Sequence, residues 1–450
     1  MQFSTNGKIL KDTVRLLNKF NSGISLNGDY VRIITAQGET MLNMTVTSSI
    51  DNLADVDYSR ASINIKINDN DSGYKQTGTA YIRFADLKSI ADLVDKEEDL
   101  YFKFYKQDKQ VIKVQIGDSL LATGVVTIPY RENIATYNDL NAAANYTNDS
   151  FVDLTDFSLT SIGKIADKIT WGCTFNPSNE KALRNVLIEV DKKSATFLAT
   201  NKHVVNRKRY IAANDRVISK EPDTPFKFAI DGKFFQCLSA NMISWEQNLK
   251  IDKNSKQLVF TADNMFITFE SANMNSYSNY NFNRVVDGIS SDFTNTATFS
   301  KYAAKGLVKA VNSAIKLNNK NYKNTIIMRF NQADSKIYIQ SFKEDKDDLI
   351  KYKAEIPVNM NFANKNTKEV AFGINGKYLV KALKTLYKDD KRDFMIDEKV
   401  NYIIKFNDLC LKPIALTSSA DNYTYADIES EYLELITPVL IRNMKEQLND

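Results

Sequence analysis

Basic side chains recur in three stretches of this sequence at the spacing of one helix face. At about 100° per residue, the lysines and arginines of each stretch fall on one arc, and leucine, valine and alanine fall opposite. The basic residues are Lys8, Lys11, Arg15 and Lys19 in the first stretch, Lys301, Lys305, Lys309 and Lys316 in the second, and Lys377, Lys381, Lys384 and Lys388 in the third. Such a face repels itself unless a polyanion neutralises it and releases counterions. The pattern predicts a surface for nucleic-acid phosphates.

These arcs show no interleaved aromatic residues and no set of side chains suited to reading base edges. The predicted contact is therefore independent of sequence, and stacking on single strands is disfavoured. One lysine stripe alone is more often an ordinary solvated helix face, but repetition at equivalent places favours DNA. The residues expected to face DNA are Lys8, Lys11, Arg15, Lys19, Lys164, Lys168, Lys301, Lys305, Lys309, Lys377, Lys381, Lys384 and Lys388.

Other helical stretches carry the pattern weakly. The stretch 152–170 offers only Lys164 and Lys168 on its polar face, and in another stretch Asp92 and Asp95 share the face of Lys88. The basic character is therefore expected to be uneven along the chain.

Enzyme chemistry finds few candidate residues. His203 is the one histidine of 450 residues, which excludes a multi-histidine metal centre. Cys173, Cys237 and Cys410 have no CxxC spacing and are expected to be buried thiols. The acid clusters at 345–348 and 389–390 could hold magnesium in a nuclease, although charge-rich turns explain them more simply. No phosphate-binding loop of the GxxxxGK type is present. We expect no catalytic residue, metal or cofactor.

The helices belong to an internal repeat, in which a short alternating strand precedes an amphipathic helix. Six copies occur, at 2–19, 81–96, 152–170, 226–245, 297–317 and 370–388. Further runs predict strands at 30–34, 61–67, 111–116, 186–190, 258–269, 326–330 and 337–342. We predict three α+β domains, 1–145, 146–292 and 293–450, each with two helices packed on antiparallel sheets.

Composition fits a large polar-surfaced protein. Hydrophobic residues make up 43% of the chain and the formal net charge is +4, so any DNA contact must come from local charge placement. No apolar run approaches the roughly 20 residues that span a bilayer, and the first ten residues lack the pattern of a signal peptide. The expected location is the cytoplasm, without membrane contact.

At four places the sequence resembles the bacterial β sliding clamp, the processivity subunit of DNA polymerase III. These are the opening Met1-Gln2-Phe3-Ser4 with the helix 10–20, the stretch 186–203, the strand–helix unit 373–386, and the closing stretch 435–440. The resemblance implies a homodimer that closes head to tail into a ring of six domains around duplex DNA. It also implies two partners, a replicative DNA polymerase and a clamp loader.

The resemblance further implies a pocket for short hydrophobic partner peptides between the second and third domains. Its walls are expected to be Leu183, Thr200, Lys202, His203, Val204 and Val205 from the second domain and Pro438, Val439 and Leu440 from the C-terminus. The family commonly has Thr-Asp-Gly-His-Arg-Leu where this chain has Thr-Asn-Lys-His-Val-Val, and this chain continues with a polar tail from Arg442 to Asp450. These departures suggest a divergent clamp, encoded by a phage or mobile element.

Two alternatives stay open beside the clamp. One is a DNA-binding scaffold built from the same repeat without ring closure, and the other is the metal-dependent nuclease. For ring closure, the strand at 120–127 and the helix end near Leu317 are the candidate interfaces. For His203, a surface histidine without function is an equally good interpretation.

Overall fold

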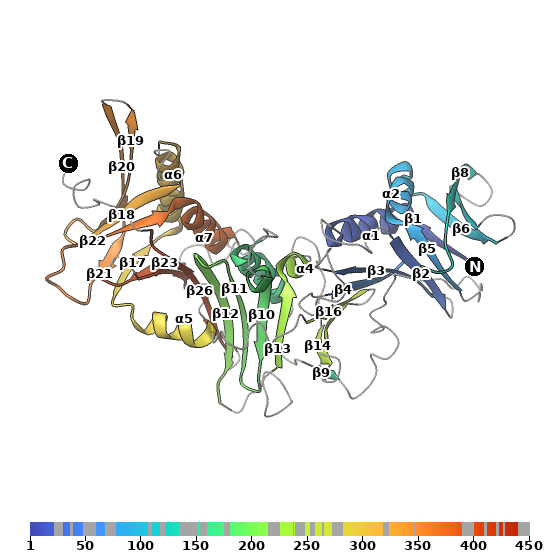
Figure 1. Cartoon of the computed structure of the whole chain (residues 1–450), viewed down its shortest axis with the longest axis horizontal. Helices are drawn as coiled ribbons and strands as arrows, with labels where there is room; N and C mark the ends of the chain where they lie inside the picture. The colour runs from blue at the N-terminus through green and yellow to red at the C-terminus, as the bar shows by residue number, and fades with distance from the viewer. Residues whose placement is uncertain are drawn as a thin grey trace. The chain divides into compact units, whose positions relative to one another are not determined.

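The computed structural model describes most of the chain and divides it into two compact units. The described residues are 1–21, 30–36, 39–47, 60–67, 78–106, 110–117, 122–134, 151–153, 160–174, 181–214, 226–236, 238, 248–252, 257–262, 265–271, 282–317, 324–345, 348–388, 400–408, 412–419, 423–425 and 428–439. One unit comprises Met1–Ala166 and Ile218–Ser276, and the other comprises Asp167–Val217 and Tyr277–Asp450 (Figure 1).

The first unit contains two antiparallel sheets. The smaller has the order β1 (Gln2–Asn6), β6 (Asp99–Tyr105), β7 (Val111–Gly117), β8 (Ala122–Pro129). The larger has the order β5 (Gly78–Arg83), β2 (Tyr30–Ala36), β3 (Glu39–Thr47), β4 (Arg60–Lys66), β16 (Met265–Glu270), β15 (Gln257–Ala262), β14 (Asn248–Asp252), β9 (Phe151–Asp153).

Helices α1 (Gly7–Phe20), α2 (Phe84–Leu93) and α4 (Gly232–Gln236) belong to the same unit. Strand β13 (Phe226–Asp231) leads into α4. The rings of Phe20 and Phe234 stack with centroids 6.1 Å apart, which joins the end of α1 to α4. Helix α3 (Thr160–Ile169) crosses the boundary between the two units and continues into the 3₁₀ turn η2 (Thr170–Gly172).

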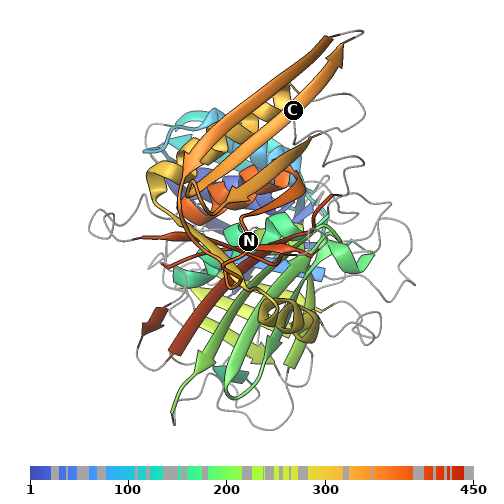
Figure 2. The ribbon, with the colours of Figure 1, turned by 90° about the vertical axis from the view of Figure 1, so that its left-hand side faces the viewer.

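The second unit is built in the same manner. Its longer run of strands has the order β10 (Asn185–Val190), β11 (Ser194–Thr200), β12 (Val204–Ala212), β26 (Ile428–Ile436), β24 (Ile414–Ser418), β23 (Tyr402–Phe406), β17 (Asn295–Phe299), β21 (Asn359–Asn361), with β25 (Tyr423–Tyr425) also on β26. The other sheet has the order β20 (Asp348–Pro357), β19 (Lys336–Asp345), β18 (Thr325–Asn331), β22 (Glu369–Asn375). The β19–β20 hairpin extends beyond its neighbours (Figure 2).

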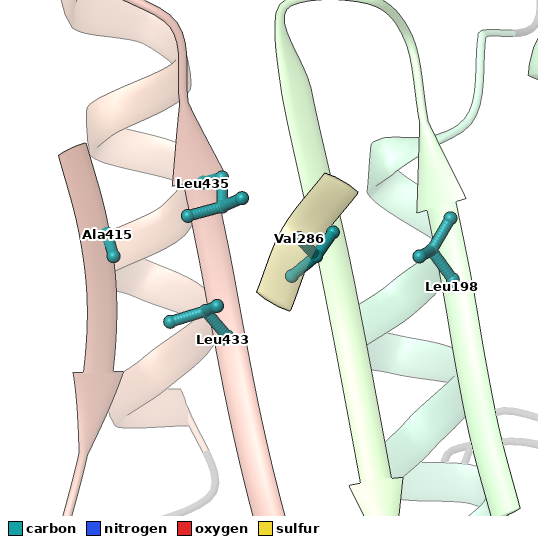
Figure 3. Packing of buried hydrophobic residues seen from close by; sticks show 5 residues of the cluster. All are labelled: Leu198, Val286, Ala415, Leu433 and Leu435. Carbon is teal, nitrogen blue, oxygen red and sulfur yellow. The ribbon is translucent and has the colours of Figure 1, made fainter. Parts of the chain in front are cut away.

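Helices lie on both faces of the longer run of strands. On one face, α7 (Gly376–Lys388) contacts β24 and β26; it also packs on α6 (Lys301–Lys316), which lies against β18, β19 and β20 of the other sheet. Helix α5 (Phe282–Ser291) covers the opposite face, where Val286 packs over Leu198, Leu433 and Leu435 (Figure 3). These four side chains are at most 3% exposed, so they form the core beneath α5.

The division into two compact units follows from strand pairing that continues across the predicted domain boundaries. Strand β4 of the predicted first domain pairs with β16 of the second, over residues from Arg60 to Ile65. Strand β12 of the second domain pairs with β26 of the third, over all of Val204–Ala212. Because each half of the middle domain extends a neighbour's sheet, its strands divide between the units. The three-domain boundaries themselves remain a prediction.

All six predicted strand–helix copies are present, as β1–α1, β5–α2, β9–α3, β13–α4, β17–α6 and β22–α7. A polar residue at the end of four of these strands accepts a hydrogen bond from the first turn of the helix, as N-caps do. The donors and acceptors are Ile9 N to Asn6 Oδ1, Lys233 N to Asp231 Oδ1, Ala303 N to Ser300 Oγ and Lys377 N to Asn375 Oδ1. The repeat is therefore also a repeat of local helix-starting chemistry.

Glycine follows the cap in three of these copies, at Gly7, Gly232 and Gly376. A Cβ at Gly7 would lie 1.9 Å from the carbonyl oxygen of Asp95, and one at Gly376 would lie 2.9 Å from Ile315 Cδ1. At Gly7 the neighbouring atom is backbone, so only glycine permits this close approach. Gly376 brings the start of α7 close to Val311 and Ile315 of α6.

The predicted strands are found with one difference. The run at 258–269 is a hairpin, β15 and β16, in which Ala262 pairs with Met265. The strand predicted at 120–127 is β8, which lies at the edge of its sheet. Among the helices of the described residues, none is both long and apolar enough for a transmembrane span.

Candidate DNA-binding surface and partner site

Helices α6 and α7 of the second unit both carry lysines without an opposing acidic residue. They contain eight lysines and no acidic residue. Lys305, Lys309, Lys377, Lys381 and Lys384 are exposed, and Lys301 is half-buried. The predicted basic arcs of both helices are thus solvent-facing where their side chains are described; the side chain of Lys388 lies outside the described residues.

The opposite faces of the two helices form core. In α7, Leu379, Leu383 and Leu386 are at most 2% exposed, and in α6, Leu307 and Val311 are fully buried. Because the apolar stripe anchors each helix on its sheet, packing of that stripe directs the lysines toward the opposite side of the helix. Burial raises the pKa of the Tyr387 phenol, so this neighbour adds no negative charge to the surface at neutral pH.

Helix α1 carries a weaker version of this surface in the first unit. Lys8 and Arg15 are exposed, and Lys11 is half-buried. Arg15 lies 3.3 Å from Asp12 in an ion pair whose side chains are 70% and 57% exposed, so part of the positive charge is offset. The side chains of Lys19 and Lys164 lie outside the described residues.

Helix α2 departs from the basic pattern as predicted. Asp92 and Asp95 are exposed near Lys88. Arg83, the residue before the helix, pairs with Asp86 through two hydrogen bonds of 2.9 and 3.1 Å. The described helices therefore carry positive charge unevenly, with α6 and α7 at the high end.

The prediction that Lys168 faces DNA is wrong. Lys168 is 6% exposed, and its Nζ lies over the ring of Tyr432, 5.1 Å from the centroid. Its carbonyl oxygen accepts hydrogen bonds from Asn206 Nδ2 and Tyr432 Oη, both at 3.1 Å. The sequence placed Lys168 on a polar helix face, but the β12 and β26 strands cover that face and turn it into a buried polar contact.

The described basic arcs also contain an aromatic residue that the sequence pattern did not identify. Tyr302 lies in the first turn of α6 between Lys301 and Lys305, and its side chain is 87% exposed. Its hydrophobicity alone would assign Tyr302 to the core side of the helix. Its helical angle places Tyr302 among the lysines instead.

A second group of predicted site residues gathers at the turn between β11 and β12. Lys202 has a φ of 76°, in the left-handed region that non-glycine residues rarely adopt. Asn201 Oδ1 accepts hydrogen bonds from the backbone of His203 at 3.0 Å and of Val204 at 2.9 Å, and Thr200 Oγ1 accepts one from Lys202 N at 3.2 Å. The Asn-Lys pair thus supplies a turn for which the resembled family uses Asp-Gly.

The C-terminal segment runs beside this turn. Thr437 N donates to the carbonyl oxygen of His203 at 2.9 Å, and Val439 N donates to that of Gly373 at 2.8 Å. His203 stacks on Tyr378 of α7 with ring centroids 6.2 Å apart and an interplanar angle of 21°. The structure therefore brings together two stretches that the sequence separates by more than 200 residues.

Predicted wall residues differ in their surroundings. His203, Lys202 and Val439 are exposed, and Pro438 is half-buried. Leu183, in the turn η3 (Lys181–Arg184), is 7% exposed. The structure thus places the β11–β12 turn beside the C-terminal segment Thr437–Val439, while Leu440 lies outside the described residues.

Val205 does not share this site. It pairs with Leu435 and packs on the cluster beneath α5, on the sheet face opposite to Val204. Successive residues of a strand point to opposite faces, so Val204 and Val205 cannot both line one wall. Sequence reasoning also missed Tyr378 and Gly373 as neighbours of the site, because only the fold brings them there.

A buried ionic contact secures the strand pair next to the site. Arg207 on β12 is 2% exposed and bonds Asp287 of α5 and, at 3.0 Å, Glu431 of β26. Arg209 lies 3.7 Å from the other oxygen of Asp287. Arg207 therefore connects α5, β12 and β26 a few residues from the β11–β12 turn.

The described residues offer little for metal chemistry. They contain no group of three or more histidine, cysteine, aspartate or glutamate residues that could hold an ion. Asp345 and Asp348 pair across the end of the β19–β20 hairpin, while Asp347, Asp389 and Asp390 lie outside the described residues. Cys173 is buried, as expected, and the other two cysteines are not described.

Comparison with known proteins links this chain to one fold. No protein-family profile and no curated protein matches the sequence. Solved structures match it over 98% of its length: the DNA polymerase sliding clamp of Bacillus subtilis (14% identity, 99% of that chain, TM-score 0.70), the sliding clamp of Pseudomonas aeruginosa bound to griselimycin (12%, 100%, 0.70) and the polymerase beta subunit of Streptococcus pyogenes (15%, 100%, 0.68). The chain has the α+β clamp fold along its full length.

Proposed function

We propose that this chain, which has the fold of the bacterial sliding clamps, is itself a DNA sliding clamp that encircles duplex DNA and tethers a replicative polymerase. The observation that carries the proposal is the paired surface of α6 and α7, where exposed lysines stand on an apolar anchor without a single acidic residue. In a chain with nearly balanced total charge, such a local excess favours a polyanionic partner.

The proposed action is topological rather than catalytic. Lysines on flexible side chains contact phosphates through mobile, water-mediated interactions, which hold the duplex without fixing a register. A protein that reads no base edge can slide, and a closed ring cannot dissociate sideways. The role requires no metal, cofactor or reacting side chain, and its place of action is proposed to be the cytoplasm.

Ring closure by two copies is part of this proposal, with each copy contributing three domains bounded near residues 145 and 292. An open sheet edge supports it. β8 ends its sheet without a charged residue, and its Val125 is 61% exposed. Edge strands that stay apart from other chains usually carry charges or are covered, so an uncharged edge favours pairing. Closed symmetry is the usual outcome of such interfaces.

The dimer is tested by light scattering across a dilution series. The account predicts a mass of twice the 51.1 kDa of one chain that persists on dilution. Replacing Val125 with lysine should shift the mass toward that of one chain, because the charge opposes pairing at the edge. A single-chain mass at every concentration would favour the scaffold without ring closure.

The β11–β12 turn with the C-terminal segment is proposed as the partner site, for peptides of the polymerase and clamp loader that carry a leucine and an aromatic residue. Its composition supports this role: Val439 and Pro438 supply apolar surface, and His203 with Tyr378 supplies an aromatic and polar edge. Peptide anchors of this kind derive most of their affinity from a few buried side chains.

Replacing Val439 with aspartate is expected to weaken binding of a short peptide containing leucine and phenylalanine by about 10-fold, because an acid replaces apolar contact surface. The measurement is fluorescence anisotropy with a labelled peptide. Leu93→Asp is the matched control, since Leu93 is 65% exposed on α2 in the other unit and should leave affinity unchanged. Equal affinities of the Val439 variant and the unmodified protein would exclude this location.

A further inference from the structure

Tyr302 is the most exposed of the large hydrophobic side chains in the described part of the chain, at 87%. The side chain is neither core nor covered by a neighbouring element. The described residues provide it with no hydrogen bond and no ring contact. An aromatic ring left this open on an otherwise well-packed helix needs a physical account.

Its position on α6 supplies one. At about 100° per residue, Tyr302 lies within roughly 20° of Lys309 and about 60° of Lys305, and opposite the buried Leu307 and Val311. Ser300 caps the helix, so its first turn is ordered and the direction of Tyr302 is fixed by the backbone. Both exposed lysines therefore lie on the same helix face as the ring, Lys305 about one turn and Lys309 about two turns further along α6.

A cationic helix face with an exposed aromatic ring is suited to binding phosphates and unpaired bases together. Lysines neutralise phosphates of either single or double strands. A ring face, by contrast, gains most from an unpaired base, because the bases of a duplex already stack on one another. Grooves that bind single strands combine these two features, positive charge along the backbone and aromatic rings for the bases.

We propose that Tyr302, with Lys305 and Lys309, forms a binding site for single-stranded DNA, in which an unpaired base stacks on the tyrosine ring. The inference rests on the proposed function for the phosphate-binding lysines and extends it to a second DNA form. A clamp at the end of a primer meets both forms, the duplex behind the polymerase and the single-stranded template ahead. The site recognises bases by their faces and not by sequence.

The test compares the full-length protein with Tyr302→Ala, Tyr302→Phe and Tyr302→Trp. Binding to a short fluorescent oligothymidylate and to a duplex of equal length is measured by anisotropy at low salt. Tyr105→Ala is the matched control. Tyr105 is also exposed, at 42%, and lies beside a lysine, with Lys113 Nζ 5.0 Å from the ring centroid, but it belongs to strand β6 of the other unit.

The expected result is a loss of about 10-fold in oligothymidylate affinity for Tyr302→Ala, in line with one base–aromatic stack. Tyr302→Phe should keep the affinity, and Tyr302→Trp should keep it while its indole fluorescence falls on binding. Duplex affinity of Tyr302→Ala should change by less than about twofold, since the lysines remain. The Tyr105 variant should behave as the unmodified protein.

Three outcomes would overturn the proposal. Tyr302→Ala could bind oligothymidylate unchanged; Tyr302→Phe could lose as much as Tyr302→Ala, which would assign the effect to the hydroxyl; or duplex affinity could fall equally. Failure of the proposed ring can be distinguished from failure of this site. If the protein stays a single chain and is not retained on circular DNA, the ring is excluded. If that protein still binds oligothymidylate through Tyr302, the single-strand site remains supported.

Discussion

Replacing Lys377, Lys381 and Lys384 together with glutamate is expected to lower duplex affinity by about 100-fold near 0.1 M salt. All three lysines are exposed on α7, and no acid of that helix already offsets them. Each lost phosphate contact removes a released counterion, so the slope of log affinity against log salt should fall by about 3. Anisotropy with a labelled duplex over a salt series measures both quantities.

The matched control reverses three exposed lysines of the same unit that do not lie on α6 or α7: Lys192, Lys365 and Lys368. This variant has the same net charge as the α7 variant, and it should lose affinity only through the weak general change in charge. Thermal unfolding of both variants should match that of the unmodified protein, because exposed lysines contribute little to stability. Equal losses of affinity in the two variants would remove α7 from the DNA-binding surface.

Replacing Arg207 with alanine is expected to lower the free energy of unfolding of the second unit by about 3 kcal/mol, within the usual cost of breaking a buried ion pair. The arginine is 2% exposed, while its partners Asp287 and Glu431 are 49% and 40% exposed and can be rehydrated in part. The loss should therefore lie at the low end of that range, and urea unfolding measures it.

The structural consequence should be local. Arg207 lies on the strand pair that joins Val204 to Ile436, next to the backbone bond from Thr437 to His203. Hydrogen exchange at β12 and β26 should accelerate, and affinity for the partner peptide should fall with it.

Arg207→Met separates charge from packing, because an apolar side chain of similar length fills the space without leaving an ion. It should recover most of the stability, as apolar replacements of buried pairs often do. Arg83→Ala is the surface control: this arginine pairs with Asp86 but is 59% exposed, so its loss should change stability by less than about 1 kcal/mol. Similar unfolding of the Arg207 and Arg83 alanine variants would contradict the account.

The repeat could be predicted from sequence because its signals are local. The alternation of β1, the cap at Asn6 and the apolar stripe of α1 all lie within twenty residues, and the same holds at Asn375 and α7. The pairings of β4 with β16 and of β12 with β26 depend on residues about 200 positions apart. No local pattern specifies them, so the division into two units was not foreseen.

The same distinction applies to the sites. Lys305 and Lys381 could be placed on exposed arcs from helical periodicity alone. Lys168 has the same local pattern, but a distant strand carrying Tyr432 covers it. The position of Val205 could have been predicted from sequence, because successive residues of a strand such as Val204 and Val205 face opposite sides of the sheet. Tyr378 became part of the partner site only because the fold brings α7 beside His203.

A ring that encircles DNA leaves it only over a free end, so retention on circular DNA distinguishes a ring from a surface binder. The protein is incubated with a nicked circular plasmid long enough for rings to open and close again, and free protein is then removed by gel filtration in moderate salt. We expect the protein to stay with the circle and to be lost when a restriction enzyme linearises the same plasmid. Equal retention on circular and linear DNA, or none on either, would contradict a ring that encircles the duplex.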